Sequence, residues 1–291
     1  MTAEHGATAC AIEVLERGAA RAGGTAKGTI LVVAAHPDDE TIGVGATLGA
    51  WLASGWRVYV LHVTDGAPEK IALRYALRHL GREEAAAVRR AEVTEALRAG
   101  GLTTDPFLLP SMGIADQDAA LEMTEVASKL ATCAELLEVD LLVTHPYEGG
   151  HPDHDAVAFA AHAAAALRAR EGAFALAEMT SYHTRGGSLV TGAFREGADA
   201  PTPACSRQHP GPLDDAARAR KRRMLDAFAT QAEILGPFRA EAEPLRCAPR
   251  YDFTRPPHEG KLHYESLPFD WTGARWCELA RASLRNLGLA T

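Results

Sequence analysis

The chain has 291 residues, of which 47% are hydrophobic and 23% are charged, and its formal net charge is −8. This composition is typical of a globular protein and argues against a largely disordered chain. The acidic balance argues against broad binding to nucleic-acid phosphates, which requires a basic surface. The five cysteines are odd in number and form no CxxC pair, so we expect neither a disulfide framework nor a Cys-based zinc site.

Residues 1–28 are interpreted as a lead-in in which residues 8–21 could form a helix. This segment contains several glutamates and no long apolar run, so we do not expect a secretory signal. No stretch of the sequence approaches the roughly 18 apolar residues of a membrane span. We therefore expect a cytoplasmic protein with no membrane span and no nucleic-acid partner, and its oligomeric state stays open.

Strands and helices are expected to alternate after this lead-in. The apolar, β-branched run 30–35 predicts a buried parallel strand, and 57–63 predicts a second one, with a helix rich in Gly and Ala at 41–54 between them. Further along the chain we expect helices at 83–99, 118–138, 153–170, 214–235 and 273–287, strands at 106–109 and 141–144, and a hairpin of 177–183 with 189–194.

This alternation predicts an α/β fold, a Rossmann-like three-layer sandwich with a mainly parallel sheet. We expect one domain over residues 28–235, preceded by the 1–28 lead-in. A C-terminal extension, 236–291, is expected to pack on the same domain. Three aromatic residues of this extension are interpreted as packing residues: Phe269, Trp271 and Trp276.

A cluster of polar residues follows the first predicted strand: His36-Pro37-Asp38-Asp39-Glu40. In open parallel sheets, ligands bind beyond the carboxyl ends of the strands. A His and an Asp three residues apart in a tight turn can point at one metal ion, which leaves the intervening Asp38 close to the metal but unbound. The alternative is a polar turn in which an Asp caps the next helix.

A second polar cluster, at residues 145–155, follows the predicted strand 141–144 and should occupy the same edge of the sheet. His151 and His154 are three residues apart at a predicted helix start, so they point to similar sides. Two histidines and a carboxylate are typical ligands of a catalytic Zn²⁺ that keeps one position open for water. The alternative is a surface loop with helix-capping acids.

Together the two clusters resemble motifs of the LmbE-like or PIG-L-like family of zinc-dependent N-deacetylases. That family carries (P/A)-H-P-D-D-E after its first strand and a later H-P-D-H, which match residues 35–40 and 151–154 without substitution. The resemblance extends over about residues 28–235. Its weaker matches are Thr64-Asp65-Gly66, Arg89-x-x-Glu92, Gly113-Ile114-Ala115-Asp116 and Thr230-Gln231.

The resemblance implies a metal site and a base. His36, Asp39 and His154 would bind Zn²⁺, with another divalent transition metal as the alternative. Asp38 would be the general base that activates water. These roles agree with the chemistry of amide hydrolysis, in which a carboxylate that does not bind the metal can accept a proton.

The resemblance also implies roles around the substrate. His151 would stabilise the oxyanion or protonate the leaving amine, and Asp153 would hold the imidazole of His151. Arg89 and Asp116 match positions that contact the sugar. Some family members place a mobile Tyr directly before the Gly-His pair, but here Glu148-Gly149-Gly150 follow Tyr147, which therefore receives no role.

These roles imply a zinc-dependent hydrolase that removes an acyl group, expected to be acetyl, from the amine of an N-acetylglucosaminyl-type small molecule. The alternatives are a hydrolase of another amide such as a thiol-conjugate amide, a nucleotide-binding Rossmann protein, and an inactive carbohydrate-binding relative. The pair Gly43-x-Gly45 matches a dinucleotide fingerprint only in part, because Leu48 replaces its third glycine, so we interpret the pair as helix packing. The presence of Asp38 weighs against an inactive relative.

Other polar residues are interpreted as structural. The basic residues within 218–223 are expected to form a solvated helix face rather than a nucleic-acid site. His62 lies in an apolar strand and is interpreted as a core histidine with a satisfied side chain. His183 is expected to be structural, whereas His145 could equally well support the metal ligands or belong to the core.

Overall fold

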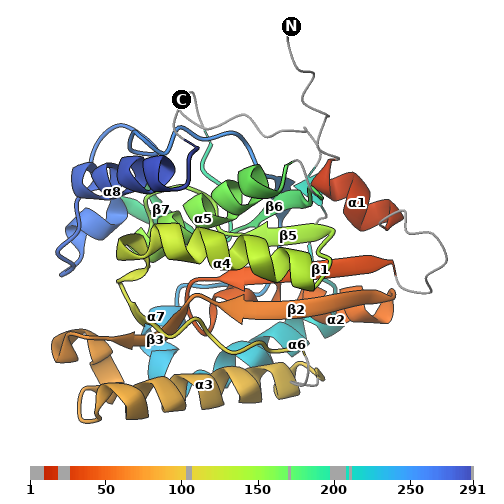
Figure 1. Cartoon of the computed structure of the whole chain (residues 1–291). Coiled ribbons are helices and arrows are strands. Elements are labelled where there is room, and N and C mark those ends of the chain that lie inside the picture. Colours follow the sequence, from red (N-terminus) through yellow and green to blue (C-terminus); the bar gives the residue numbers. More distant parts are fainter. Residues whose placement is uncertain are drawn as a thin grey trace, which may run out of the picture.

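The computed structural model describes residues 10–18, 27–102, 107–169, 172–196, 208–209 and 212–289. Among these residues, six strands form one sheet in the order β2-β1-β5-β6-β10-β9 (Figure 1). The first four run parallel to one another, and β10 and β9 are antiparallel additions. The bounds are β1 (Gly28–Ala34), β2 (Trp56–His62), β5 (Leu141–Thr144), β6 (Ala175–Met179), β10 (Leu245–Cys247) and β9 (Gln208–His209).

Helices cover both faces of the sheet, so the predicted three-layer α/β fold is confirmed. Successive side chains of a strand point to opposite faces, and all seven residues of β1 are buried. Leu31 and Val33 belong to one hydrophobic core, and Ile30 and Val32 to the other. The first core includes residues of α4 (Met123–Leu136), α5 (Pro152–Arg168) and α8 (Gly273–Asn286); the second includes residues of α2 (Asp39–Ala53), α3 (Arg82–Ala99) and α6 (Asp215–Asp226).

The glycines of α2 allow this helix to lie close to its neighbours. A Cβ atom on Gly43 would lie 2.5 Å from the sulfur of Met179, and one on Gly45 would lie 3.4 Å from the terminal methyl of Met224. Larger side chains at Gly43 would therefore push α2 away from β6. This contact confirms that the Gly43-x-Gly45 pair serves packing, and it removes the sequence support for a dinucleotide site.

The two longest predicted helices are interrupted. The segment predicted as 118–138 consists of η2 (Ala119–Leu121) followed by α4, and the segment predicted as 214–235 consists of α6, η3 (Ala229–Gln231) and α7 (Ala232–Leu235). The second break has a clear cause, because the carboxylate of Glu92 in α3 accepts hydrogen bonds from the backbone N–H and the hydroxyl of Thr230, both at 2.7 Å. This contact joins two of the weak family motifs, which lie far apart in the sequence.

The predicted strand 177–183 is also divided. Its first part belongs to β6 in the central sheet, and its second part is β7 (Tyr182–Arg185), which forms a hairpin with β8 (Ser188–Thr191). Residues 107–109 make only a bridge to β2, through Leu108 and Val60, and residue 106 of the predicted strand lies outside the described residues. A short parallel sheet of β3 (Thr64–Pro68) and β4 (Ile114–Asp116) was not predicted.

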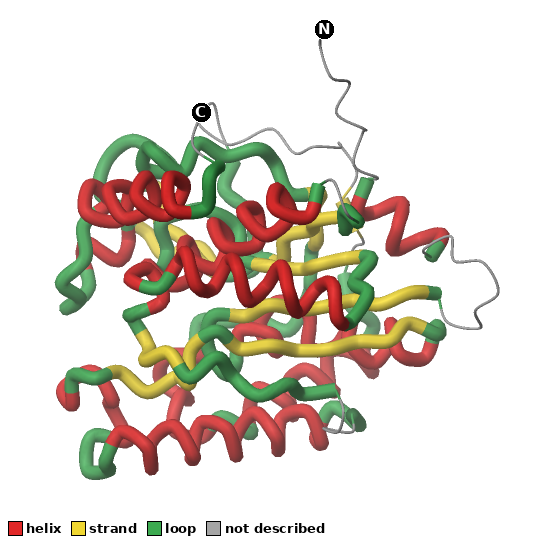
Figure 2. The backbone as a smooth tube through the Cα atoms, viewed as in Figure 1, coloured by secondary structure: helices red, strands yellow, loops and turns green. Residues whose placement is uncertain are grey.

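The remaining elements are short or belong to the C-terminal region. They are α1 (Ala11–Arg17), η1 (Ile71–Leu77) and η4 (His263–Ser266). In the C-terminal region, β10 pairs with β6 in the central sheet, and Trp276 is completely buried in the core. Figure 2 shows the paired strands running alongside one another, with loops at their ends. Within the described residues, every helix is too short or too polar to span a bilayer.

Two expectations about side chains are wrong. Lys221, predicted on a solvated helix face, is 1% exposed and forms an ion pair of 3.0 Å with the buried Glu243. Its ammonium group also donates to the carbonyl of Ile42, so it ties α6 to α2. Cys247 is disulfide-bonded, although the spacing of the cysteines predicts no disulfide framework.

Candidate metal and catalytic site

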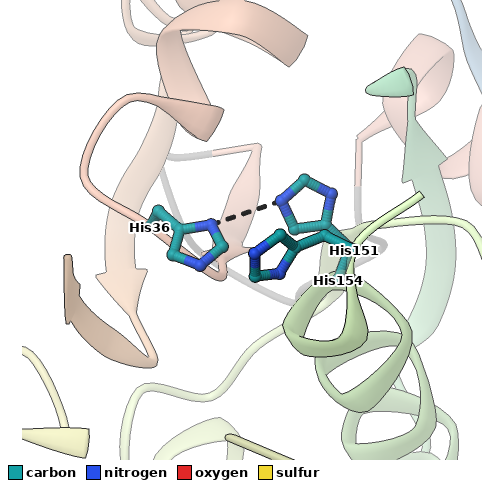
Figure 3. Close-up of side chains that lie close together, drawn as sticks. All are labelled: His36, His151 and His154. Carbon is teal, nitrogen blue, oxygen red and sulfur yellow. Dashed lines mark hydrogen bonds between the residues drawn. The ribbon is translucent and has the colours of Figure 1, made fainter. Parts of the chain in front are cut away.

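The two polar clusters meet at the carboxyl edge of the sheet. His36 follows β1, while His151 and His154 lie at the start of α5, which follows β5. Because β1 and β5 are adjacent parallel strands, the loops that follow them leave the same edge. Figure 3 shows the three imidazoles grouped there, with the interaction between His36 and His154 drawn as a dashed line. The clusters are thus one site, as the sequence predicts.

Three atoms of this site lie at the corners of a small triangle. His36 Nδ1 is 3.1 Å from Asp39 Oδ2, and both lie 3.3 Å from His154 Nε2. Ligands at about 2.0–2.1 Å from a tetrahedral zinc ion are separated by about 3.3 Å. The triangle therefore has the size of one face of a zinc coordination shell.

In His36 and in His154, the ring nitrogen that faces away from this triangle has a polar partner of its own. His36 Nε2 donates to Asp153 Oδ2 at 3.2 Å, and His154 Nδ1 lies 3.1 Å from the hydroxyl oxygen of Ser181. We assign the ring protons to these outer nitrogens, because a carboxylate can only accept and a hydroxyl oxygen can accept. Metal-binding imidazoles are held in this way in known sites. The inner nitrogens, which face one another, then carry only lone pairs.

His151 has the opposite arrangement. Its Nδ1 accepts a hydrogen bond from the backbone N–H of Asp153 at 3.2 Å. In the neutral ring this bond places the proton on Nε2, which can then donate a hydrogen bond but cannot bind a metal. Although a nitrogen of His151 lies within 4.8 Å of ligand atoms of His36 and His154, its tautomer makes it a hydrogen-bond donor beside the metal position.

His145 packs against His154 and does not line the cavity. Its ring stacks on the ring of His154, with centroids 4.1 Å apart and an interplanar angle of 11°. Its Nε2 accepts the backbone N–H of Ala35 at 3.0 Å, so the lone pair of that nitrogen is already used. Of the two roles that the sequence left open for His145, the geometry favours support of a ligand.

The electrostatics of this cluster of side chains favour the binding of a cation. Lone pairs of two imidazoles and a carboxylate converge here, and this arrangement is repulsive unless a positive charge, either a metal ion or a proton on an inner nitrogen, lies among them. Burial alone would lower the pKa of His36, but Asp116, Asp153 and Asp39 raise it well above its usual value. Burial opposes ionisation of Asp39, yet His154 and His145 lower its pKa well below normal. The residues therefore fit a divalent metal ion.

Asp38 lies in the same cavity but has a different partner. Its Oδ2 accepts a hydrogen bond of 2.8 Å from Arg89 Nη2, and the same nitrogen donates to the carbonyl of Pro37 at 2.8 Å. Burial raises the pKa of Asp38 to about 6, although Arg89 works in the opposite direction. Asp38 is thus a carboxylate held beside the metal position by a buried arginine, with a proton affinity suited to catalysis near neutral pH.

The backbone of this turn is fixed by a buried pair. His62 Nε2 lies 2.8 Å from Glu40 Oε2, which also accepts the backbone N–H of Asp38. Both side chains are at most 2% exposed. His62 is thus a satisfied core histidine, as predicted, and it holds Glu40 against the turn that carries Asp38 and Asp39.

The structure corrects the expectation for Asp153. We expected its carboxylate to hold the imidazole of His151, but that carboxylate contacts His36 and accepts the backbone N–H groups of Gln117 and Ala119. Only the backbone of Asp153 reaches His151. The backbone N–H groups of Gln117 and Ala119, which lie before α4, hold the carboxylate of Asp153 on the side of His36.

Arg89 and Asp116, which were predicted to contact a sugar, both line the site cavity, but they differ in how accessible their side chains are. Arg89 is 3% exposed and committed to Asp38, while Asp116 is partly exposed, with Oδ1 3.1 Å from His36 Nε2 and 3.9 Å from His151 Nε2. Tyr147 is buried against aromatic residues of the core, and its hydroxyl donates to the carbonyl of Arg255. Tyr147 does not line the cavity.

Sequence reasoning missed several residues around the site. Tyr182 lines the cavity, with its ring 5.2 Å from that of His154, and Ser181 precedes it at the break between β6 and β7. Phe269, predicted to be a packing residue, also lines the cavity, and its ring lies 5.1 Å from that of His151. No local sequence signal distinguishes these residues, because long-range folding brings them to the site.

Comparisons with known proteins agree with this fold and site. A family model described as PIG-L: GlcNAc-PI de-N-acetylase matches residues 31–165. The matched segment holds every proposed metal ligand.

Two relatives named 1D-myo-inositol 2-acetamido-2-deoxy-alpha-D-glucopyranoside deacetylase are similar to the chain. The protein from Kineococcus radiotolerans is 32% identical over 167 residues, which cover 49% of this chain and 46% of the relative. The protein from Streptomyces scabiei is 28% identical over 279 residues, covering 79% of this chain and 86% of the relative. The first match thus spans about half the length of the curated relative.

Solved structures show the same fold at low identity. A deacetylase solved as a complex with teicoplanin has a TM-score of 0.56 and 16% identity, covering 77% of this chain and 100% of that chain. The N,N'-diacetylchitobiose deacetylase from Pyrococcus horikoshii has a TM-score of 0.51 and 20% identity, with 78% and 79% of the two chains covered. At such identities, the likeness concerns the fold alone.

Proposed function

We propose that the chain is a divalent-metal-dependent N-deacetylase that hydrolyses the acetamide of an N-acetylglucosaminyl compound. The observation that carries this proposal is the triangle of His36 Nδ1, Asp39 Oδ2 and His154 Nε2 beside the buried carboxylate of Asp38. The match to the PIG-L family model and the names of the two similar relatives support the same chemistry.

His36, Asp39 and His154 would hold one metal ion. Two imidazoles and one carboxylate favour Zn²⁺ among the divalent metals, although the donor set also suits other divalent transition metals. When bound, such an ion lowers the pKa of a coordinated water toward about 7 and polarises the substrate carbonyl.

Asp38 is the proposed general base. Arg89 occupies Oδ2 of its carboxylate, which leaves Oδ1 to face the attacking water. Asp38 takes one proton from this water as the oxygen bonds to the acetamide carbon. With a pKa of about 6 in the folded protein, Asp38 is mostly ionised at neutral pH and is still a competent base.

His151 is the proposed oxyanion donor. The backbone N–H of Asp153 on its Nδ1 keeps the proton on Nε2, and burial is the largest of the effects that lower the pKa of His151 well below normal. A neutral ring that donates Nε2–H can stabilise the developing negative charge of the carbonyl oxygen. The amine then receives the proton that Asp38 took from water, the C–N bond breaks, and acetate and the free amine leave.

Asp116 and Arg89 are proposed to contact the sugar. The partly exposed carboxylate of Asp116 can accept hydrogen bonds from hydroxyl groups close to the reacting amide. Arg89 lines the same cavity, although its Nη1 is buried and forms an ion pair of 3.5 Å with Glu92 Oε2. The main role of Arg89 is nevertheless to position Asp38.

An amine-release assay tests this function. Zinc-loaded and metal-stripped protein would be incubated with a panel of N-acetylated sugars and with a thiol-conjugate amide. We expect metal-dependent release of amine and acetate in equal amounts from N-acetylglucosaminyl compounds, and release that is roughly 10²–10⁴-fold slower with Asp38→Asn. Cleavage of the thiol-conjugate amide alone would instead support the other amide hydrolase, and no metal-dependent cleavage of any compound would overturn the proposal.

A further inference from the structure

The cavity that holds the metal site continues along an apolar wall. The polar end consists of the residues described above, and the same cavity of about 250 Å³ is lined further out by Leu73, Leu77, Ile234, Leu235 and Phe238. The two leucines at 73 and 77 belong to η1, Ile234 and Leu235 belong to α7, and Phe238 lies shortly after α7. η1 contacts η3, which directly precedes α7, so two segments distant in the sequence build one continuous wall.

The rim of this wall exposes large apolar side chains. Tyr75, Ile234 and Leu189 are 47%, 43% and 43% exposed, and all three line the cavity. Single exposed hydrophobic residues are normal on protein surfaces. Three of the eight large hydrophobic residues exposed in the described chain surround this one opening, however, and such clustering marks a binding surface.

The backbone of Tyr75, at the rim of this wall, is strained. Tyr75 has φ 46° and ψ −113°, in a region that non-glycine residues rarely adopt. Buried Arg74 holds the segment by donating hydrogen bonds to the carbonyls of Pro68, Glu69 and Leu80 at 2.8–3.1 Å. Strain of this kind persists where the surrounding structure enforces it, commonly at ligand-binding positions. The exposed ring of Tyr75 therefore lines the cavity at an energetic cost.

We infer that the substrate carries an apolar group next to its acetamide, and that this wall binds that group. This inference rests on the proposed function, because the acetamide must lie at the metal site. A polyol in that position would need hydrogen-bond partners, and Leu73, Ile234 and Phe238 have none to offer. The occupant is part of the substrate because the wall and the metal site share one cavity. The substrate class is thus an N-acetylglucosaminide with an alkyl or aryl aglycone.

The test compares two substrates that differ only in apolar length, the methyl and the octyl glycosides of N-acetylglucosamine. Each methylene withdrawn from water is worth up to about fourfold in affinity. We therefore expect a kcat/KM at least about tenfold higher for the octyl compound, below its critical micelle concentration, in zinc-loaded protein. Tyr75→Ala and Ile234→Ala should abolish most of this preference, because each should lower kcat/KM for the octyl compound far more than for the methyl compound.

Leu52→Ala is the matched control. Leu52 is 37% exposed, comparable to the rim residues, but it lies on α2 and does not line the cavity. This variant should keep the full preference for the octyl compound. Equal kcat/KM for the two glycosides, or a preference that survives in both Tyr75→Ala and Ile234→Ala, would overturn the inference.

A binding measurement separates this inference from the proposed function. Isothermal titration of the wild-type protein with both glycosides does not require turnover. If neither compound is hydrolysed but the octyl compound binds more tightly and Tyr75→Ala removes the difference, the proposed function fails and the apolar site stands. If the octyl compound binds no better than the methyl compound and neither is hydrolysed, both proposals fail.

Discussion

The carboxylate of Asp153 contacts Nε2 of His36 at 3.2 Å, across 117 residues of sequence. This contact determines which nitrogen of His36 faces the metal position. In Asp153→Asn, the side-chain amide can donate to Nε2, which would move the ring proton to Nδ1 and block metal binding. We expect zinc affinity to fall by about 10–100-fold, as for other supporting partners of metal ligands, measured by titration against a competing chelator.

Asp116 provides a matched control for this prediction. Its Oδ1 is also 3.1 Å from His36 Nε2, but Asp116 is partly exposed and lies on the cavity side of the ring. Asp116→Asn should therefore reduce zinc affinity less than Asp153→Asn does, while it weakens catalysis on N-acetylglucosaminyl compounds. The reverse order of zinc affinities would show that Asp116, and not Asp153, sets the tautomer of His36.

The adjacent residues Asp38 and Asp39 should respond differently to the same substitution. Asp38→Asn should keep zinc affinity and lower kcat by roughly 10²–10⁴-fold, the usual contribution of a general base. Asp39→Asn should weaken zinc binding, because Asp39 Oδ2 lies within 3.3 Å of both ligand nitrogens. Metal content and single-turnover rates measured on the same samples distinguish the two effects. A fully active Asp38→Asn protein would disprove the mechanism.

His151 and His154 offer a similar comparison. His154→Phe should lose zinc, since Nε2 of His154 is a proposed ligand. His151→Phe should keep zinc affinity within about threefold and lose roughly 10²–10³-fold in kcat, the effect of removing one oxyanion donor. Equal loss of zinc in both variants would mean that Nε2 of His151 carries a lone pair and binds the metal.

The sequence was most informative where structure is local. The apolar run of β1 predicts a buried strand, and the two His-containing turns follow strands of one sheet, so their meeting could be expected from the topology of parallel sheets. Contacts between distant segments could not. Asp153 had two imidazoles within reach, and only the fold shows that its carboxylate faces His36. The sequence places Lys221 on a charged helix face. Its burial is possible because it pairs with Glu243, which comes from a segment where the sequence predicts no such contact.

The apolar wall shows the same limit. Tyr75 and Ile234 are ordinary residues of two short segments, and neither segment has a periodicity that indicates a binding surface. Their relation arises because η1 contacts η3 next to α7, and because Glu92 interrupts the helix that the sequence predicts across residues 214–235. A helix continued through Thr230 would leave no such turn beside η1.

The last prediction concerns stability at acid pH and a histidine outside the site. His162 in α5 packs against the rings of Tyr251 and Phe253, and its Nε2 has no hydrogen-bond partner within the described residues. Burial lowers the pKa of His162 to about 4, whereas in the unfolded chain it is about 6.5. Between these values the unfolded chain binds the extra proton, so the free energy of unfolding falls as the pH falls.

His162→Leu should remove this part of the pH dependence. Urea unfolding at pH 7 and pH 5, with the metal content kept equal, gives the loss of stability on acidification for each protein. We expect the wild-type protein to lose roughly 1–2 kcal/mol more than His162→Leu between these pH values. His79→Leu, at an exposed position, should lose as much stability as the wild type. If His162→Leu also shows the full loss, the acid sensitivity arises elsewhere in the fold.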